Sequence, residues 1–404
     1  MPSPVLDTRG QMLRRVAEAN LGVCLIASVR APGRVNLIGE HIDYCNLAVL
    51  PMAIQRDVRI DFTPREDARV RLANTNPAHP PFEFFAAEEI EPAPQGDWSN
   101  YPRAAVQRLV ARLGPLRGFD GVVDGSVPEA AGLSSSSALL VASALAILAA
   151  NEKRLPRLEL AELCAEAERY VGTNSGGMDQ AISLMAEAGH ALRVEFAPLR
   201  VEAIPVPPSW RFVIADSLVV AEKSGSLRES YNARRAASEA ALLALARQRG
   251  SVGQRGNYRE LLAQFSVNEL LAMASKSMPY ELLRRFRHIV SESARVDQAC
   301  TALRAADAAS FGAAMDASQQ SLEEDCQVSH PELERLVQLA RKHGALGARL
   351  TGAGLGGCIV ALVLESKAEA LLEALAEEFF AERLPARELR HHLLLARPSA
   401  GAAW

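Results

Sequence analysis

Hydrophobic and polar residues follow two different periods along this chain. In some stretches they alternate and include many β-branched residues, as in half-buried β-strands. In others the hydrophobic residues recur every three or four positions, as along one face of an α-helix. The pattern predicts strands over residues 24–31, 58–62, 70–73, 118–123, 191–196, 212–215, 348–351, 358–364 and 391–396. It predicts helices over residues 134–151, 159–171, 180–186, 231–249, 260–275, 280–306 and 331–343.

The predicted strands and helices are interleaved, but they do not form a regular βαβα repeat. Helices dominate the second half of the chain, and strands return only near its end. This order favours an α+β fold. We expect two domains, residues 1–203 and 204–404, that meet at a proline-rich stretch around residues 198–211. A second proline-rich stretch, residues 91–102, predicts a loop inside the first domain.

The composition is that of a globular protein with a large core. Of the 404 residues, 49% are hydrophobic and 23% are charged, which excludes a disordered or low-complexity chain. The 44 basic and 48 acidic residues give a net charge of −4, so nothing points to a nucleic acid or a membrane surface as a partner. The six cysteines include no CxxC pair, and the first residues have no secretory signal pattern. We expect a cytoplasmic protein with reduced thiols.

The first segment with candidate chemistry spans residues 30–44 and reads RAPGRVNLIGEHIDY. Gly33 and Gly39 predict tight turns of the backbone. Charged side chains at such short spacing suit a small polyhydroxy ligand, because each sugar hydroxyl both donates and accepts hydrogen bonds. A surface turn with solvated charges is the alternative, and the residues alone leave both open. The polar side chains concerned are Arg34, Glu40, His41 and Asp43.

The second segment, PEAAGLSSSSAL at residues 128–139, opens the most apolar predicted helix. A glycine and four serines at a helix N-terminus expose backbone N–H groups, and the helix dipole adds positive charge there. The segment therefore predicts an anion site, and a serine hydroxyl there could also bind Mg²⁺. A serine-rich helix cap is the alternative, but one serine is enough for a cap.

There are two further segments, a third at residues 349–358 and a fourth at residues 172–183. Residues 349–358 contain GxGxxG, but a strand follows instead of the helix that a dinucleotide fold requires, so we expect a strand, a glycine turn and a second strand. Residues 172–183 read GTNSGGMDQAIS and place Asp179 at the head of a predicted helix. A carboxylate there is also favoured by the helix dipole alone. Glu166 and Glu168 lie on the preceding helix.

Taken together, the four segments resemble the galactokinase branch of the GHMP small-molecule kinases. Stretches such as RLANTNP and ERYVGTNSGGMDQAIS are similar to the eukaryotic galactokinase and N-acetylgalactosamine kinase group. The likeness runs from about residue 30 to residue 398. It implies a two-domain GHMP kinase fold with the active site in the cleft between the domains. It also implies ATP-dependent phosphorylation of the C1 hydroxyl of galactose.

The resemblance implies roles for residues of the first and fourth segments. Asp179 would accept the proton of the sugar's C1 hydroxyl, and Arg34 would stabilise charge on the transferring phosphoryl group. Tyr231 would lie at the edge of the sugar pocket. The sugar would be held by Arg34, Glu40, His41, Asp43, Gly176 and Asp179.

The resemblance also implies how ATP and Mg²⁺ are bound. Ser136 and Glu168 would bind Mg²⁺, with Glu166 as the second choice for the carboxylate. The residues expected near the adenine or elsewhere on the nucleotide are Trp98, Asn100 and Lys223. The residues expected around the phosphates are Gly132, Leu133, Ser134, Ser135, Ser136 and Ser137. We expect a monomer whose partners are a sugar and ATP.

Two positions depart from the family pattern, and other functions stay open. Ala130 stands where the phosphate loop usually has its first glycine, and Leu355 replaces an aromatic residue in the third segment. N-acetylgalactosamine is the alternative sugar, because one sequence does not show the room at C2. A non-catalytic galactose sensor is the alternative class, but the full-length GLSSSSA loop and Asp179 favour an enzyme. A mevalonate or homoserine kinase is disfavoured by the polar cluster at residues 40–43.

Overall fold

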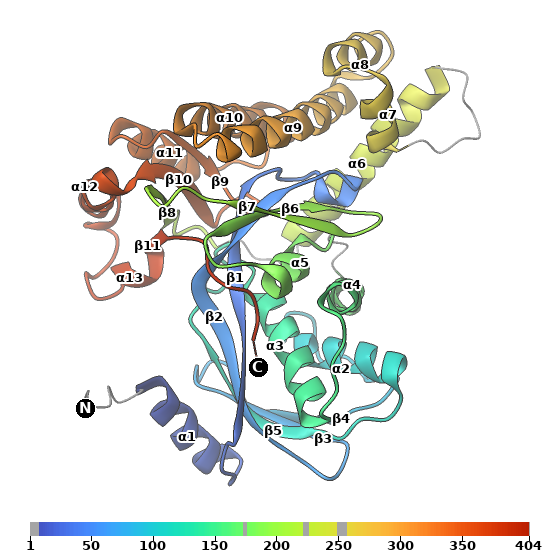
Figure 1. Ribbon diagram of the computed structural model, residues 1–404, viewed down its shortest axis with the longest axis vertical. Helices are drawn as coiled ribbons and strands as arrows, with labels where there is room; N and C mark the ends of the chain where they lie inside the picture. The colour runs from blue at the N-terminus through green and yellow to red at the C-terminus, as the bar shows by residue number, and fades with distance from the viewer. Residues whose placement is uncertain (1–7, 173–175, 221–225, 249–256, 404) are drawn as a thin grey trace.

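The computed structural model describes residues 8–172, 176–220, 226–248 and 257–403. Its two main sheets come from the N-terminal and the C-terminal halves of the chain, and helices pack against each (Figure 1). The predicted α+β class is confirmed by this arrangement. Within the described ranges, no helix combines the length and the hydrophobicity that a membrane span needs. All six cysteines are free thiols.

The N-terminal sheet has the strand order β1-β2-β5-β3-β4, and all its pairs are antiparallel except β3 with β5. Its strands are β1 (Ala27–Ile38), β2 (Leu50–Pro64), β3 (Arg69–Asn74), β4 (Phe82–Phe85) and β5 (Phe119–Gly125). One face is covered by α2 (Asn100–Leu113), α3 (Ser135–Ala150), α4 (Arg157–Ala167) and α5 (Met178–Met185). The opposite face is covered by α1 (Thr8–Asn20), which packs against β3 and β5.

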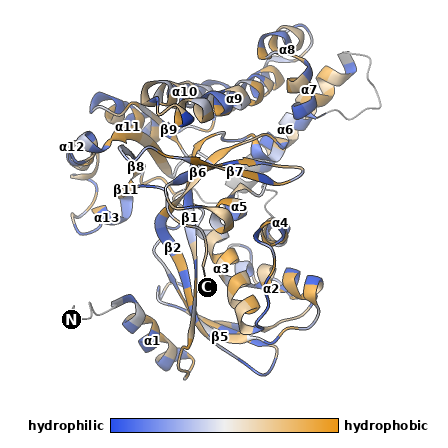
Figure 2. Ribbon diagram, viewed as in Figure 1, coloured by the Kyte–Doolittle hydropathy of each residue, from blue (hydrophilic) through white to orange (hydrophobic). Residues whose placement is uncertain are grey.

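Helix α3 is the centre of this half. Its hydrophobic residues surround the helix on all sides (Figure 2), and nearly every residue after the first turn is buried. A helix that is hydrophobic all round is stable only inside a core. Packing against α2, β1 and β2 therefore fixes the axis of α3, and with it the position of the serines at its N-terminus.

The C-terminal sheet is antiparallel with the order β11-β8-β10-β9. Its strands are β8 (Trp210–Asp216), β9 (Gly347–Leu350), β10 (Cys358–Leu364) and β11 (Leu393–Ala396). The helices packed on or beside it are α9 (Tyr280–Arg304), α10 (Ala308–Ser321), α11 (Pro331–Lys342) and α12 (Glu365–Leu375). Helix α6 (Ser226–Gln248) packs along α9, and the short α13 (Leu389–His392) precedes β11.

Two connections join the halves. The hairpin of β6 (His190–Glu195) and β7 (Arg200–Pro205) contacts the N-terminal sheet through the bridge between Val49 and Val194, and β7 packs on α9. The C-terminal tail then returns to the first sheet, where Ala403 pairs with Arg30. The division at residue 203 falls within β7 and stays a prediction.

Some predicted elements match the structure closely and others do not. The strand over residues 358–364 is β10 with the same bounds. The single helix expected over residues 260–275 is wrong, because it is two helices, α7 (Tyr258–Gln264) and α8 (Val267–Ala274). Ser266 and Glu269 form a capping box that starts the second one. The expected loop over residues 91–102 ends where α2 begins at Asn100.

Gly312 and Gly347 allow α10 and β9 to touch through their backbones. A Cβ atom at Gly312 would lie 2.1 Å from the carbonyl oxygen of Leu346, and one at Gly347 would lie 2.2 Å from the carbonyl oxygen of Gly312. We expect Gly312→Ala to lower the free energy of unfolding by about 3 kcal/mol, because backbone atoms must move apart. Denaturant titration measures this, with the exposed Ala313→Ser as control. Unfolding midpoints that coincide for both variants would contradict the close contact.

Candidate active site

The first segment forms the long strand β1 and not a turn at Gly33. The predicted turn at Gly33 is wrong, because Gly33 lies inside the strand. Its missing side chain matters for a contact with the serine-rich loop instead. A Cβ atom at Gly33 would lie 2.9 Å from the carbonyl oxygen of Leu133. The glycine therefore allows the serine-rich loop to approach the strand. Gly39, with φ of +100°, provides the turn after β1.

Arg34, Asp179 and the serine-rich loop meet at one point. The Nε of Arg34 donates to Oδ1 of Asp179 over 2.8 Å, and its Nη1 donates to the carbonyl oxygen of Gly132 over 2.6 Å. The hydroxyl of Ser134 donates to Oδ2 of Asp179, and that of Ser137 lies 3.3 Å from the same oxygen. Strand β1, helix α3 and helix α5 thus place a buried cation, a carboxylate and a helix N-terminus in contact.

The turn before α5 brings Asp179 beside the residues of the first segment. The Gly176 N–H donates to Oδ2 of Asp43 over 2.9 Å. A Cβ atom at Gly176 would lie 2.6 Å from the carbonyl carbon of Asp43, so only glycine fits there. Gly177, with φ of +94°, then starts the helix, and Asp179 falls in its first turn. Asp43, Gly176 and Asp179 therefore lie in one region, as the resemblance implies.

The charges in this region depend on burial. Burial opposes the charge of Arg34, but the carboxylates of Asp179 and Glu40 outweigh it, so the pKa of Arg34 is raised. Burial raises the pKa of Asp43 to about 6, although the bond from Gly176 acts against this. Burial lowers the pKa of His41 to about 3, which makes it a neutral imidazole. Burial also raises the pKa of Glu40, although the charges of Arg349 and Arg34 act against this. The region thus holds one permanent cation and two carboxyl groups with a raised pKa.

Glu40 and His41 contact the third segment. Oε1 of Glu40 accepts the Gly352 N–H over 2.7 Å and the Thr351 hydroxyl over 3.3 Å. Nε2 of His41 donates to the carbonyl oxygen of Ala353 over 3.2 Å. The predicted arrangement of strand, glycine turn and strand is confirmed by the pairing of β9 with β10. This turn supports the first segment from the C-terminal half.

The second and third segments also touch each other through their glycines. A Cβ atom at Gly352 would lie 2.9 Å from the carbonyl oxygen of Gly132, and one at Gly357 would lie 3.0 Å from that of Ala131. Ser134 begins α3 in the left-handed region with φ of +60°. Ala130 has φ of +54°, so this alanine adopts a conformation that favours glycine.

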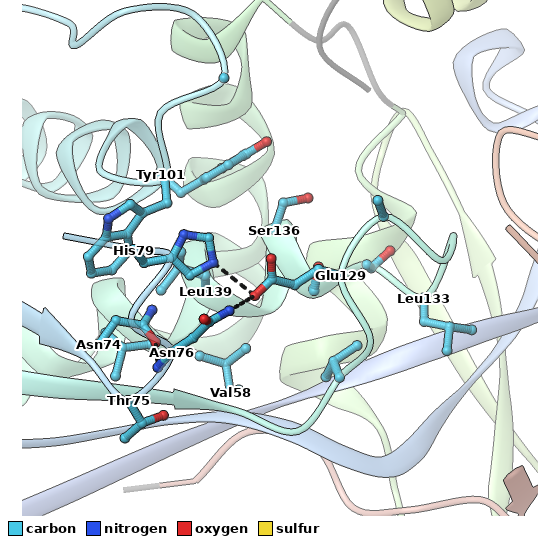
Figure 3. A pocket seen from close by; sticks show the side chains of 18 of the residues that line it. Val58, Asn74, Thr75, Asn76, His79, Tyr101, Glu129, Leu133, Ser136 and Leu139 are labelled. Atoms are coloured by element: carbon cyan, nitrogen blue, oxygen red, sulfur yellow. Dashed lines mark hydrogen bonds and ion pairs between the residues drawn. The ribbon is translucent and has the colours of Figure 1, made fainter. Parts of the chain in front are cut away.

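A cavity of about 410 Å³ opens beside the serine-rich turn (Figure 3). Glu129 lies across it and accepts hydrogen bonds from Nε2 of His79 over 2.9 Å and from Nδ2 of Asn76 over 3.3 Å. The expected residues that line it are Trp98, Gly132, Leu133, Ser134, Ser135 and Ser136. Its aromatic wall and its helix N-terminus could hold a planar base and an anion at the same time.

Not every expected contact lines the cavity. Ser137 does not, and its hydroxyl bonds to Glu168 and Asp179 instead. Asn100 does not line the cavity, because its carboxamide bonds to the backbone of Ala93 and Pro94 and shapes the loop before α2. Lys223 lies outside the described residues. Tyr231 lies on α6, but its side chain is outside the described part of the structure.

The two candidate metal carboxylates differ sharply in position. Oε1 of Glu168 accepts the Ser137 hydroxyl over 2.5 Å, and the side chain is buried next to the serine-rich turn. Glu166 faces outward and pairs with Arg108. Within the described ranges, no three His, Cys, Asp or Glu residues form a metal cage. One carboxylate and nearby hydroxyls fit Mg²⁺, which commonly keeps waters and shares phosphate oxygens.

Helix α9 also contacts the first segment, and no motif in the sequence predicted this contact. Oε1 of Glu292 accepts the Gly39 N–H over 2.9 Å, and Nε2 of His288 donates to the carbonyl oxygen of Glu40 over 2.9 Å. Both side chains are fully or almost fully buried, one helical turn apart. They lie about 250 positions from the residues they hold, so only the folded structure shows the contact. We call Glu292 and His288 the α9 clamp.

We expect Glu292→Gln to raise the KM for the sugar about tenfold and to leave the KM for ATP within about twofold. The Glu292 oxygens accept bonds from Gly39, Ser318 and Arg295, and an amide would place donors against donors, which costs roughly 1–3 kcal/mol. Steady-state kinetics with each substrate varied measures the effect. Asp297→Asn, on the exposed side of the same helix, is the control. Equal losses for both substrates would contradict the α9 clamp.

The sequence and the structure both match known proteins. Residues 100–187 match the GHMP kinase N-terminal domain, residues 299–381 match the GHMP kinase C-terminal domain, and residues 24–64 match the galactokinase galactose-binding signature. A galactokinase from Roseiflexus sp. is 39% identical over 93% of this chain and 92% of its own length. The chain belongs to the galactokinase family. A galactokinase from Chloroflexus aggregans is 40% identical over 86% of both chains.

A solved structure of this family has the same fold. The galactokinase of Lactococcus lactis, crystallised with galactose, superposes with a TM-score of 0.86 at 29% identity and covers 98% of this chain and 99% of its own. A mevalonate kinase superposes with a TM-score of 0.61 at 19% identity over 92% of this chain, which shows the shared GHMP kinase fold alone. The galactokinase signature includes all four polar residues of the first segment, so this family assignment agrees with the geometry above.

Proposed function

We propose that this protein is an ATP-dependent galactokinase that transfers the γ-phosphoryl group of ATP to the C1 hydroxyl of galactose. Family membership supports the reaction class. The observation that carries the proposal is the contact of Arg34, Asp179 and the N-terminus of α3 beside the 410 Å³ cavity. A sugar hydroxyl beside the Asp179 carboxylate would then lie next to a nucleotide phosphate at the N-terminus of α3.

Phosphoryl transfer depends mostly on positioning and charge neutralisation, because its transition state is loose. Asp179 would accept the C1 hydroxyl proton as the oxygen bonds to phosphorus. Arg34 is held by Asp179 and by the Gly132 carbonyl oxygen, so its charge is already oriented when substrates bind. The backbone N–H groups of Ser135 and Ser136 would hold phosphate oxygens at the start of α3.

Sugar recognition would come from the first segment and from Gly176. Asp43 is buried, and its carboxylate can accept hydrogen bonds from two adjacent ring hydroxyls. Glu40 and His41 are oriented by the third segment through Gly352 and Ala353. An epimer with a misplaced hydroxyl would leave such a buried group unpaired, at a cost of roughly 1–3 kcal/mol.

The proposal includes Mg²⁺, a monomeric state and the cytoplasm. Glu168 and the hydroxyl of Ser136 would hold the ion, which neutralises phosphate charge when bound. Six free cysteines suit a reducing compartment. A net charge of −4 gives no reason to expect a nucleic acid as a partner.

An ATP-consumption assay with galactose and N-acetylgalactosamine in competition tests the function. We expect sugar-dependent release of ADP with galactose and little inhibition by an equal concentration of N-acetylgalactosamine. Faster turnover with N-acetylgalactosamine would reassign the sugar. No release of ADP with either sugar would favour the non-catalytic sensor.

Galactose affinity is expected to fall about tenfold between pH 7 and pH 5. The pKa of Asp43 is about 6 before the sugar binds, so the carboxylate that accepts sugar hydroxyls is mostly protonated at pH 5. Arg34 and His41 keep one charge state over this range, whereas burial raises the pKa of Glu40 as well as that of Asp43. Calorimetric titration at both pH values measures the change, and Asp43→Asn, with weaker binding, should lose it. A wild-type affinity that is constant over this range would contradict the assignment.

A further inference from the structure

A second cavity, of about 520 Å³, lies where β2 of the N-terminal sheet meets β11 at the edge of the C-terminal sheet. It shares no residue with the nucleotide-side cavity. Its charged lining consists of Arg56 from β2, Arg211 from β8, Arg390 from α13, Arg397 after β11 and Glu365 from α12. Four arginines against one glutamate leave a net charge of +3.

Most of this charge has no partner of opposite sign. Arg211 pairs with Glu365. The Nη2 of Arg56 instead donates to the backbone oxygen of Arg390 over 3.1 Å, which brings a second cation to the same side. Within the part of the chain that the structure describes, Arg56, Arg390 and Arg397 form no ion pair. Three cations on one concave surface repel each other, and a bound anion would relieve this repulsion.

The neighbouring histidine is affected by the same charges. Burial lowers the pKa of His391, and the charges of Arg390 and Arg56 lower it further. A protonated imidazole is thus disfavoured beside Arg390, which indicates a positive potential there.

The floor of the cavity is hydrophobic. Ile54 and Ile214 come from the two sheets and are almost fully buried, so the exposed part of the floor is Leu394 and Leu395 of β11. Leu395 is 41% exposed. A simple inorganic anion would use the arginines and leave Leu395 in contact with water.

We propose that this cavity, which we call the junction site, binds a small molecule with a phosphate group and an organic body. Guanidinium groups bind phosphate oxygens through paired hydrogen bonds, and the hydrophobic floor would cover a sugar or base. A sugar phosphate or a mononucleotide fits the cavity's volume of about 520 Å³. The ligand would contact both sheets. This inference does not depend on the proposed kinase reaction.

Titration calorimetry tests the junction site on the full chain, with galactose and a non-hydrolysable ATP analogue at saturating concentrations to fill the active site. The probes are galactose 1-phosphate, AMP and inorganic phosphate. We expect one additional ligand per chain, with galactose 1-phosphate or AMP at least tenfold tighter than inorganic phosphate. The double variant Arg56→Gln/Arg397→Gln should weaken binding of that ligand at least tenfold, and its galactose phosphorylation should be unchanged.

The control is Arg387→Gln, which removes an equally basic side chain that is 85% exposed and outside the cavity. It should keep the affinity within about twofold, and unfolding midpoints should show that all variants are folded. No additional binding by any probe would overturn the proposal, and so would equal binding by the wild-type chain and the double variant. If inorganic phosphate binds as tightly as the organic phosphates, the role of the hydrophobic floor is overturned.

Discussion

Asp179→Asn is expected to reduce kcat by about 10³-fold and to leave galactose affinity within about threefold. Asparagine keeps the volume of the side chain and an oxygen that can accept the bond from Arg34, but it does not take the proton of the C1 hydroxyl. Binding depends more on Asp43, Glu40 and His41, which the substitution does not touch. Single-turnover kinetics with galactose and ATP, together with calorimetric titration of galactose, measures both quantities.

The control for this variant is Asp67→Asn, because Asp67 is an exposed carboxylate that pairs with Arg65 far along the N-terminal sheet. It should leave both quantities unchanged. A kcat for Asp179→Asn within tenfold of the wild-type value would remove Asp179 from the role of base. A large loss of galactose affinity with little change in kcat would make it a sugar ligand only.

Arg34→Lys is expected to reduce kcat by about 10²-fold or more with little change in fold. A lysine ammonium lacks the planar fork that reaches both Asp179 and the Gly132 carbonyl oxygen, so the charge is present but not held. Arg34→Met should also lower the free energy of unfolding by about 3–5 kcal/mol, since it leaves the mostly buried carboxylate of Asp179 without its cation.

Kinetics and denaturant titration of the two variants separate these effects. Arg30→Lys, on the same strand, is the control for the loss of a guanidinium group. If Arg34→Lys retains wild-type turnover, the orientation of the guanidinium is not required and Arg34 serves mainly the fold. If Arg34→Met is as stable as the wild-type chain, the buried ion pair contributes nothing to folding.

The parts of the site that sequence could predict are those with a local cause. The glycines at residues 352 and 357 and the hydrophobic run after them predict the turn between β9 and β10, because strand patterns and glycine turns are short-range features. The serines at the head of α3 follow from the same kind of reasoning. The catalytic role of Asp179 came only from the resemblance, because the helix dipole alone explains a carboxylate at the start of a helix.

The parts of the site that the sequence did not predict depend on contacts between distant segments. Gly33 suggests a turn by itself, but its lack of a side chain serves the approach of Leu133, a hundred positions away. The α9 clamp carries no motif, since Glu292 and His288 are ordinary residues of an amphipathic helix until they meet Gly39 and Glu40. A period of 3.6 residues predicts which face is buried and not what that face touches.

The most direct test of this account is a crystal structure with galactose and a non-hydrolysable ATP analogue. The account predicts galactose between Asp43, Gly176 and Asp179, with its C1 oxygen about 3 Å from the Asp179 carboxylate. It also predicts the γ-phosphate at the N-terminus of α3. A sugar bound elsewhere, or one whose C1 hydroxyl points away from both Asp179 and the phosphate, would contradict it.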